Sequence, residues 1–268
     1  EANRGLDFAV FGAKVFVNAM GDTDITSYDL FSPGDDLDRF LISDFPWNTP
    51  GPLWRRSAVK RVGPWDVRLR AWQDWDYHTR AIALGLKYEK FDQCAVWICR
   101  GDQERIGSRV TPERCVSIAQ MVGRTADMLR DTDLLTPVRT RLLAGLVLNN
   151  LLHCLCCGGA PADLRAIWEA ARQHELMSCF AGFELSALLP VLGRIGGRSW
   201  LVQYIDRRFP EVAATRCWSD QGLFKVDEAG RVVSLKQGRM AQTNRLSEDG
   251  PNVAPRRNRL ATALSVTT

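Results

Sequence analysis

Apolar residues recur at helical spacing along the second part of the chain, from residue 111 to about residue 210. One apolar stripe ends near Asp131, and another ends at Gly158-Gly159. The pattern predicts an array of helices, without a repeat period that would indicate a solenoid. Helix starts are indicated at Thr111-Pro112, Thr136-Pro137 and Pro161, and two shorter helices at 184–192 and 200–208.

A helix–turn–helix pattern lies earlier, between Asn48 and Tyr88. Ser57 can cap a short helix. Gly63 has the permissive backbone that can end this helix, and Pro64 cannot continue it. Asp74 precedes a second run whose apolar positions share one helix face, and Gly85 stands where a left-handed cap is wanted. The segment therefore predicts two short helices joined by a tight corner.

Asp74 has two interpretations that the pattern leaves open. Asp is among the residues preferred at a helix N-cap, where its carboxylate accepts a backbone N–H. A carboxylate at a helix N-terminus, where the helix dipole favours negative charge, is also suited to general-base chemistry. The residue is thus either a structural cap or a catalytic base.

Several motifs of this segment occur in a characteristic order. They are Pro50 to Trp54, Arg55-Arg56-Ser57, Val62 to Asp66, Gln73-Asp74-Trp75-Asp76 and Gly85. This order resembles the acceptor half of a family 2 glycosyltransferase, over roughly the first two-fifths of the chain. Gln73 stands where that family usually has Glu, and Pro64 where it has a second Gly. The resemblance implies an α/β fold, as part of a GT-A domain.

The resemblance also implies roles for single residues. Asp74 would be the catalytic base of an inverting sugar transfer from a nucleotide-diphospho sugar. Gln73, Trp75 and Trp54 would bind the acceptor, a glycan or a lipid-linked sugar. Arg100, at the end of an apolar stretch, would offer its guanidinium fork to the donor diphosphate. Asp76 is expected to be structural first and a substitute base second.

Family 2 enzymes have a nucleotide-binding half that ends in an Asp-x-Asp metal motif before the acceptor segment. Only 47 residues precede Asn48 here, so we expect a fragment without that half, inactive by itself. Mg or Mn is expected for the complete enzyme. Asp22 and Asp24 form a literal Asp-x-Asp and are weak candidate ligands. Asp36 and its neighbours Asp35 and Asp38 are equally good matches.

Charge and cysteine content add little to this interpretation. The net charge of +4 arises entirely after Phe224, where eight Lys and Arg face four Asp and Glu. This tail has little apolar periodicity and no aromatic residue, so we expect disorder there and no nucleic-acid binding. The eight cysteines lack the spacing of a zinc site, and we interpret them as reduced thiols of a cytoplasmic protein, free or peripheral to the inner face of the membrane.

Three regions are therefore expected. Residues 1–110 would be the acceptor-side part of a GT-A domain, 111–210 a helical extension, and 211–268 a disordered tail. The function would be sugar transfer in the synthesis of cell-surface polysaccharide or another glycan. The alternative is a helical protein-interaction module, binding a partner or a second copy, attached to a transferase remnant without activity.

Overall fold

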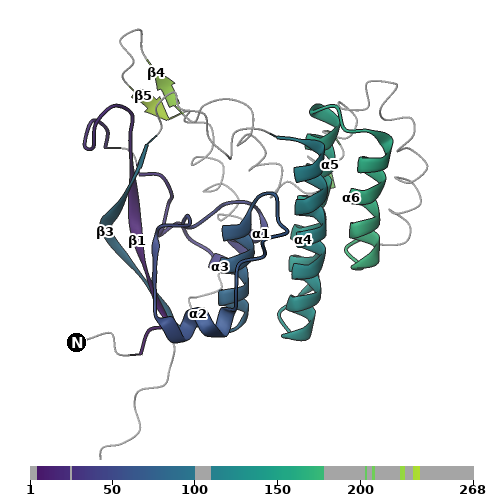
Figure 1. Cartoon of the computed structure of the whole chain (residues 1–268), viewed down its shortest axis with the longest axis horizontal. Helices are drawn as coiled ribbons and strands as arrows, with labels where there is room; N and C mark the ends of the chain where they lie inside the picture. Colours follow the sequence, from purple (N-terminus) through teal and green to yellow (C-terminus); the bar gives the residue numbers. More distant parts are fainter. Residues whose placement is uncertain are drawn as a thin grey trace, which may run out of the picture. The chain divides into compact units, whose positions relative to one another are not determined.

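The computed structural model describes residues 5–24, 26–99, 110–177, 203, 207, 208, 224–226 and 232–235. The chain divides into two compact units, Glu1–Gly222 and Leu223–Thr268. Within the described residues, the first unit contains a three-stranded sheet and six helices, and the second a pair of short strands (Figure 1). The chain therefore has the mixed α/β character that the sequence predicts.

The sheet has β1 (Phe8–Phe16) in its centre, between β2 (Pro52–Trp54) and β3 (Tyr88–Cys99). β1 and β3 are parallel, whereas β2 is antiparallel to β1. A parallel pair requires a long crossover connection, and residues 17–87 supply it. This crossover contains the helix–turn–helix segment, which is how the segment comes to lie against the sheet.

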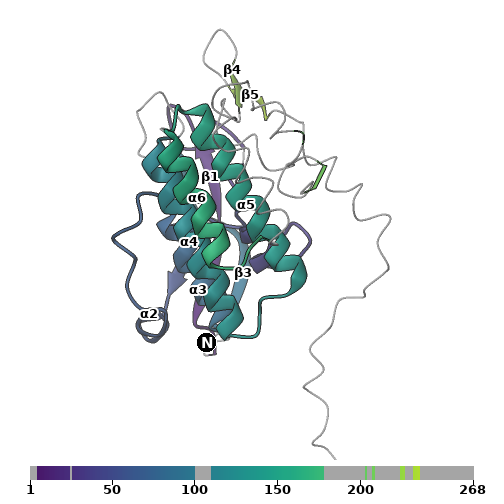
Figure 2. The ribbon, with the colours of Figure 1, turned by 90° about the vertical axis from the view of Figure 1, so that its right-hand side faces the viewer.

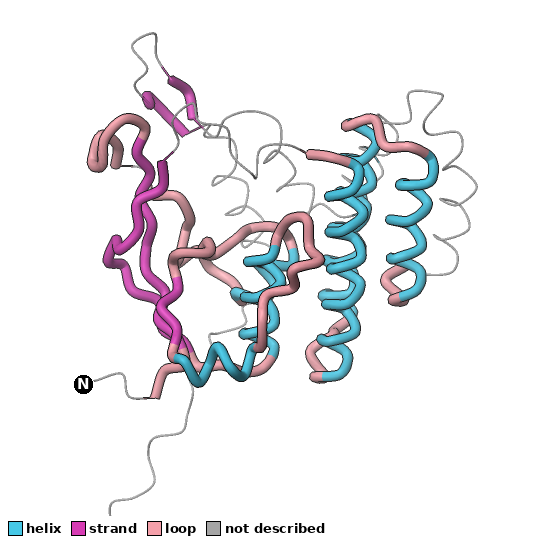
Figure 3. Tube along the Cα trace, viewed as in Figure 1, coloured by secondary structure: helices cyan, strands magenta, loops and turns pink. Residues whose placement is uncertain are grey.

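One face of the sheet is covered by helices. α1 (Asp36–Leu41) and α3 (Gln73–Ala83) lie on this face, and α2 (Arg56–Val62) lies at one end of the sheet (Figures 1 and 3). Alternate residues of β1 are buried on either side of an irregularity in its pairing with β3 at Gly12, as the pleat of a strand with one covered face requires. These residues form the centre of the core, and they are Phe8, Val10, Ala13 and Val15.

An aromatic cluster joins the three strands to this helical layer. The ring of Phe8 on β1 stacks on Trp54 of β2 at 4.2 Å and on Tyr88 of β3 at 4.8 Å. Trp47 and His78 pack beside them, with ring centroids 5.8 Å apart. Because aromatic side chains bury more area than other residues, this cluster contributes much of the stability of the α/β part.

The predicted helices after residue 111 are confirmed. α4 (Pro112–Asp131), α5 (Pro137–Cys156) and α6 (Pro161–Gln173) lie side by side (Figures 1 and 2). Thr111 and Thr136 cap the first two, each accepting from the backbone N–H three residues on. The helix expected at 184–192 lies outside the described residues. Of 200–208, residues 203, 207 and 208 are described, and all three are helical.

The helical part packs on the α/β part. α4 contacts α3, and α5 contacts α1. Arg139 at the start of α5 donates to Asp38 of α1 at 2.6 Å and to Asp35 at 3.2 Å. The chain thus changes near residue 110 from strands and helices to helices alone. The regions before and after this residue belong to one compact unit.

The short helices of the crossover begin and end by different means. Gly63, with φ of 83°, follows α2, and Gly85, with φ of 66°, follows α3, as predicted. The prediction that Ser57 caps α2 is wrong, because the helix begins at Arg56 and its N-cap residue is Arg55, without a side-chain cap. Trp72 is the N-cap residue of α3 and has a left-handed φ of 62°.

The tail contains structure where disorder was expected. In the second unit, β4 (Phe224–Val226) pairs with β5 (Val232–Leu235) as antiparallel strands. The β-branched valines favour strands, and Gly230 in the sequence between them favours a turn. Neither signal produces a helical period. The expectation of disorder from 211 to 268 stays a prediction, and within this range the structure describes these two strands as paired.

The two longest helices in the described part of the chain are α4 and α5, with 20 residues each. None of the helices in the described residues combines the required length with the required hydropathy. α5 is the most apolar, and Asn149, Asn150 and His153 interrupt its sequence.

His78 should make stability depend on pH. Its side chain is 1% exposed, and burial lowers its pKa to about 3, whereas an unfolded chain has a His pKa near 6.5. Between these values only the unfolded state binds the proton. The free energy of unfolding should therefore fall by up to about 1.4 kcal/mol per pH unit as the pH is lowered from 6.5 towards 3.

The measurement is urea denaturation across this pH range. We expect His78→Phe to remove this part of the slope. Phe40→Leu, in the same cluster, should lower stability without changing the slope. Equal slopes for the native chain and His78→Phe would contradict the assignment.

Candidate functional site

Asp74 lies in the first turn of α3, one residue after the helix begins. It is not the N-cap residue, because Trp72 occupies that position. The side chain of Asp74 is half-buried, and its Oδ1 accepts the backbone N–H of Trp75 at 2.9 Å. Its Oδ2 accepts the hydroxyl of Thr49 at 2.8 Å. The interpretation of Asp74 as an N-cap is therefore wrong, and its carboxylate is instead held by a neighbouring loop.

The loop before β2 brings Thr49 to this carboxylate. Gly51 donates to the carbonyl of Asn48 and accepts from the N–H of Phe11, so the loop is closed on itself and fixed to β1. A Cβ at Gly51 would lie 3.4 Å from the carbonyl oxygen of Phe11, which favours glycine at this close approach. Thr49 is exposed, and so the carboxylate of Asp74 borders on solvent.

Trp72 supports this geometry from the other side. A left-handed φ is uncommon for a bulky residue, and such strained residues concentrate at functional sites. Its ring packs edge-on against Phe45 at 5.6 Å. This packing holds the backbone turn that sets the direction of α3 immediately before Gln73 and Asp74.

Trp75 is a core residue, and this corrects its predicted role in acceptor binding. Its side chain is 0% exposed, and its indole N–H donates to the carbonyl of Phe40 at 2.7 Å. A ring without an exposed face has nothing on which a sugar could stack. The hydrogen bond also satisfies the one polar atom of the buried ring, as expected for tryptophan in a core.

Gln73 and Trp54 are both engaged in contacts within the chain. The side-chain amide nitrogen of Gln73 donates to the carbonyl of Leu69 at 2.9 Å, closing the loop before α3. Trp54 is half-buried between Phe8 and His78, at ring distances of 4.2 and 6.0 Å. It therefore lies against the second turn of α3, one turn beyond Asp74. Acceptor binding by either residue stays a prediction.

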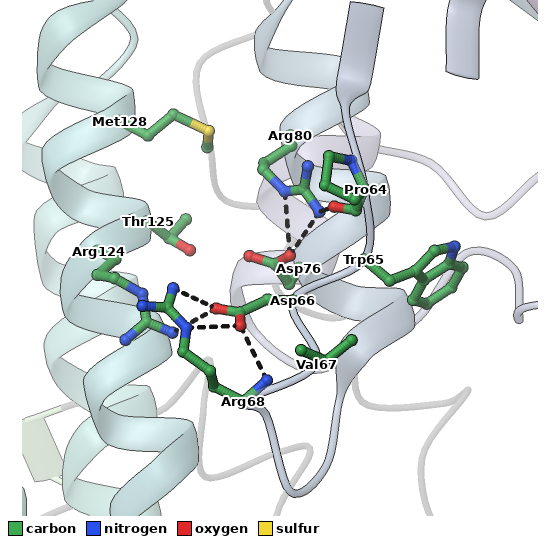
Figure 4. Close-up of a pocket in the computed structure, with 10 residues that line it drawn as sticks. All are labelled: Pro64, Trp65, Asp66, Val67, Arg68, Asp76, Arg80, Arg124, Thr125 and Met128. Carbon is green, nitrogen blue, oxygen red and sulfur yellow. Dashed lines mark hydrogen bonds and ion pairs between the residues drawn. The ribbon is translucent and has the colours of Figure 1, made fainter. Parts of the chain in front are cut away.

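Asp76 is structural, in agreement with the first expectation. Its Oδ2 accepts from Nε and Nη2 of Arg80 at 3.0 and 2.8 Å (Figure 4). Arg80 also donates to the carbonyl of Val62 at 2.6 Å and to that of Pro64 at 3.0 Å. The pair thus holds the end of α2 and the corner that follows it against α3.

The carboxylates of Asp22 and Asp24, the weak candidate metal ligands, make separate contacts within the chain. Asp22 accepts backbone N–H groups of three consecutive residues, Val17, Asn18 and Ala19, at 2.7 to 3.3 Å. These bonds, chiefly that from Asn18, lower the pKa of its carboxyl. Asp24 instead approaches Lys14, with Nζ 3.5 Å from Oδ1. The two carboxylates serve a turn and a surface ion pair.

The rival aspartates near α1 are likewise engaged. Asp35 caps α1, and Asp38 binds Arg139. Asp36 is 7% exposed and accepts from the Tyr88 hydroxyl at 2.8 Å and from Lys90 Nζ at 3.0 Å. Nowhere in the described residues do three or more His, Cys, Asp or Glu side chains form a group that could hold a metal.

Two further predictions concern residues that are described only in part. Arg100, the candidate for binding the donor diphosphate, lies outside the described residues, and so does the loop that follows it to residue 109. Six cysteines are described, none of them in a disulfide, namely Cys94, Cys99, Cys115, Cys154, Cys156 and Cys157.

A pocket of about 470 Å³ lies between the corner after α2, the Asp76–Arg80 side of α3, and α4 (Figure 4). The sequence does not indicate this pocket, because α4 is far along the chain from the other two segments. Its lining residues are Pro64, Trp65, Asp66, Val67, Arg68, Asp76, Arg80, Arg124, Thr125 and Met128.

Comparison with known proteins identifies no relative: no protein-family model, no curated protein and no solved structure matches the chain. Functional inference therefore depends on the geometry of the chain itself. The residue that sequence reasoning missed at Asp74 is Thr49, and its place in a Pro-Gly-rich loop directly before β2 was the one available signal.

Replacing Arg80 should destabilise the chain more than replacing Asp76. Arg80→Gln loses four hydrogen bonds and leaves Asp76 without its cation, which should cost about 2 to 3 kcal/mol of unfolding free energy. Asp76→Asn should cost about 1 kcal/mol, because Arg80 keeps both carbonyl partners. Urea denaturation of the two variants and the double variant gives the coupling energy. A coupling near zero would contradict a structural Asp76–Arg80 pair.

Proposed function

We propose that this chain contains the acceptor side of an inverting glycosyltransferase with a GT-A type domain, in which Asp74 is the catalytic base. The observation that carries the proposal is the state of this carboxylate. It is half-buried, borders on solvent, and is oriented by two neutral donors, the Thr49 hydroxyl and the Trp75 N–H. Within the described residues it has no ion-pair partner.

The neighbours of Asp74 support this assignment by contrast. Trp75 is buried, Asp76 is paired with Arg80, and the Gln73 amide closes a loop. Each of these residues has a structural task that fixes the first turn of α3. Of the four, Asp74 is the one whose carboxylate borders on the exposed Thr49 without an ion pair in the described residues, and a general base must reach the proton that it takes.

The order of elements is also compatible with the proposal. The acceptor segment follows β1 and precedes β3, and it lies on the covered face of a sheet whose β1 and β3 are parallel. In open α/β sheets, sites commonly form at loops beside the ends of strands. Thr49 stands in such a loop, before β2, and Asp74 stands at the helix terminus that faces it.

The proposed reaction is one displacement at an anomeric carbon. Asp74 takes the proton of an acceptor hydroxyl as that oxygen forms a bond to the anomeric carbon of a nucleotide-diphospho sugar. The bond from this carbon to the diphosphate oxygen breaks, the nucleoside diphosphate leaves with the electron pair, and the configuration inverts. The described residues do not fit a divalent-metal site, and no step is assigned to a metal.

The test is sugar transfer by the full polypeptide in lysates and membranes of cells that express it, supplied with radiolabelled UDP-, GDP- and dTDP-sugars. Asp74→Asn should lower the incorporation of label about 100-fold or more, as expected for a lost general base, and should leave the melting temperature nearly unchanged. Thr49→Val should give a smaller loss.

Asp76→Asn is the matched control, since it removes a carboxylate two residues away on the same helix. It should lower stability and retain transfer at temperatures where the fold persists. Transfer that persists in Asp74→Asn would contradict the proposed base. Absence of transfer by the native chain with every donor would favour the alternative function, a helical interaction module.

A further inference from the structure

The pocket between α3 and α4 lies on a different side of α3 from Asp74. Asp76 and Arg80 line it, whereas Asp74 is two residues earlier, roughly 200° around an α-helix from Asp76. Its volume of about 470 Å³ falls within the range of about 300 to 1,000 Å³ that small-molecule sites occupy. The proposed transfer reaction leaves this pocket without a role.

A charged cluster forms part of the lining, in which the side chain of Arg68 is 77% exposed. Asp66 accepts from Nε and Nη2 of Arg68 at 2.8 and 2.9 Å, and from Nη2 of Arg124 at 3.3 Å (Figure 4). The hydrogen bonds from Arg68, aided by Arg124, lower the pKa of Asp66 to about 2. Asp66 is therefore ionised at any physiological pH and holds both guanidinium groups at the pocket.

The same cluster has unused donors. Within the described residues, Arg124 makes one hydrogen bond, through Nη2, and its side chain is 42% exposed. Arg68 donates through Nε and Nη2, so that Nη1 remains available. Three arginines and two aspartates line the pocket, which gives a charge of +1 from 3 − 2. Guanidinium groups bind carboxylate and phosphate with two parallel hydrogen bonds, and an anion is the complementary ligand.

The opposite wall offers hydrogen-bond acceptors. Both bonds from Arg80 go to Oδ2 of Asp76, and Figure 4 shows Oδ1 directed into the gap between α3 and α4. Thr125 on α4 lines the same gap, and its hydroxyl can donate or accept. A bare anion would be repelled by Asp76. A hydroxyl group of a ligand could instead donate to Oδ1. The arginines and Asp76 together therefore favour a ligand that has both an anionic group and hydroxyl groups.

Apolar side chains line the pocket on both sides of the gap, Met128 on α4 and Pro64, Trp65 and Val67 on the segment after α2 (Figure 4). Trp65 is 40% exposed and stacks on Tyr77 at 4.7 Å. An inorganic ion would leave these residues uncovered. A sugar ring has a less polar face of C–H groups that can cover such a surface, in addition to its hydroxyls.

We propose that this pocket binds a monosaccharide-sized ring that carries one carboxylate or phosphate group. The anionic group binds Arg124 and Nη1 of Arg68, ring hydroxyls bind Asp76 Oδ1 and Thr125, and the ring covers the wall around Met128. Such a group can belong to a free sugar acid, to a sugar phosphate, or to a unit within an acidic glycan. The site is independent of Asp74 and of sugar transfer.

The test is a titration of the full chain at low salt with glucuronate and with glucose 1-phosphate, followed by NMR at the indole N–H of Trp65, assigned through Trp65→Phe. Glucose and inorganic phosphate are the comparison probes, because glucose has the ring without an anionic group and phosphate has the anionic group without a ring. We expect saturable shifts with at least one anionic sugar, and binding at least tenfold weaker for glucose and for phosphate.

Arg124→Gln should weaken binding of the anionic sugar about tenfold or more, while the melting temperature stays nearly unchanged because only one hydrogen bond of 3.3 Å is lost. Thr125→Val should also weaken it. Arg165→Gln, which replaces an exposed arginine of α6 outside the pocket, is the matched control and should have no effect.

Three results would overturn the proposal. One is glucose binding as well as the anionic sugars, and another is unchanged affinity in Arg124→Gln. The third is no shift of the Trp65 indole with either anionic sugar. Because every readout is binding, loss of this site and loss of the proposed transfer reaction are distinguishable.

Discussion

The burial of Trp75 is the constraint on which the arrangement of this chain depends. Its ring fills the space between α3 and α1, and its N–H is satisfied by the carbonyl of Phe40. Once this residue is placed, the helical periodicity places Asp74 on one side of α3 and Asp76 on another. The same anchor therefore determines a solvent-facing carboxylate at one edge and a pocket-lining carboxylate at the other.

Charged residues connect the segments around this anchor. Arg80 joins α2 to α3, Arg139 joins α5 to α1, and Asp36 with Lys90 joins α1 to β3. These contacts are mostly half-buried. At such positions, removing one partner lowers the free energy of unfolding by more than the intact pair contributes to it. They act as positioning contacts, and they explain why the helical part and the α/β part form one compact unit.

Much of the secondary structure could be predicted from local signals. Thr-Pro starts at Thr111 and Thr136 gave correct helix starts, and the glycines at 63 and 85 gave correct ends, because capping involves neighbouring residues. Ser57 failed as a cap, since the residue ahead of it had already begun the helix. The strands after Phe224 were missed because their signal is too short to stand out.

The sequence by itself determined where α4, α5 and α6 begin, where α2 and α3 end, and that Asp74 stands in the first turn of a helix. Only the tertiary structure decided which of the neighbouring residues are available for chemistry. Trp75 is hidden by Phe40, Asp76 is paired with Arg80, and Asp74 is reached by Thr49. The physical reason is that burial and pairing depend on segments distant in sequence, and a motif carries no information about which partner will cover each side chain.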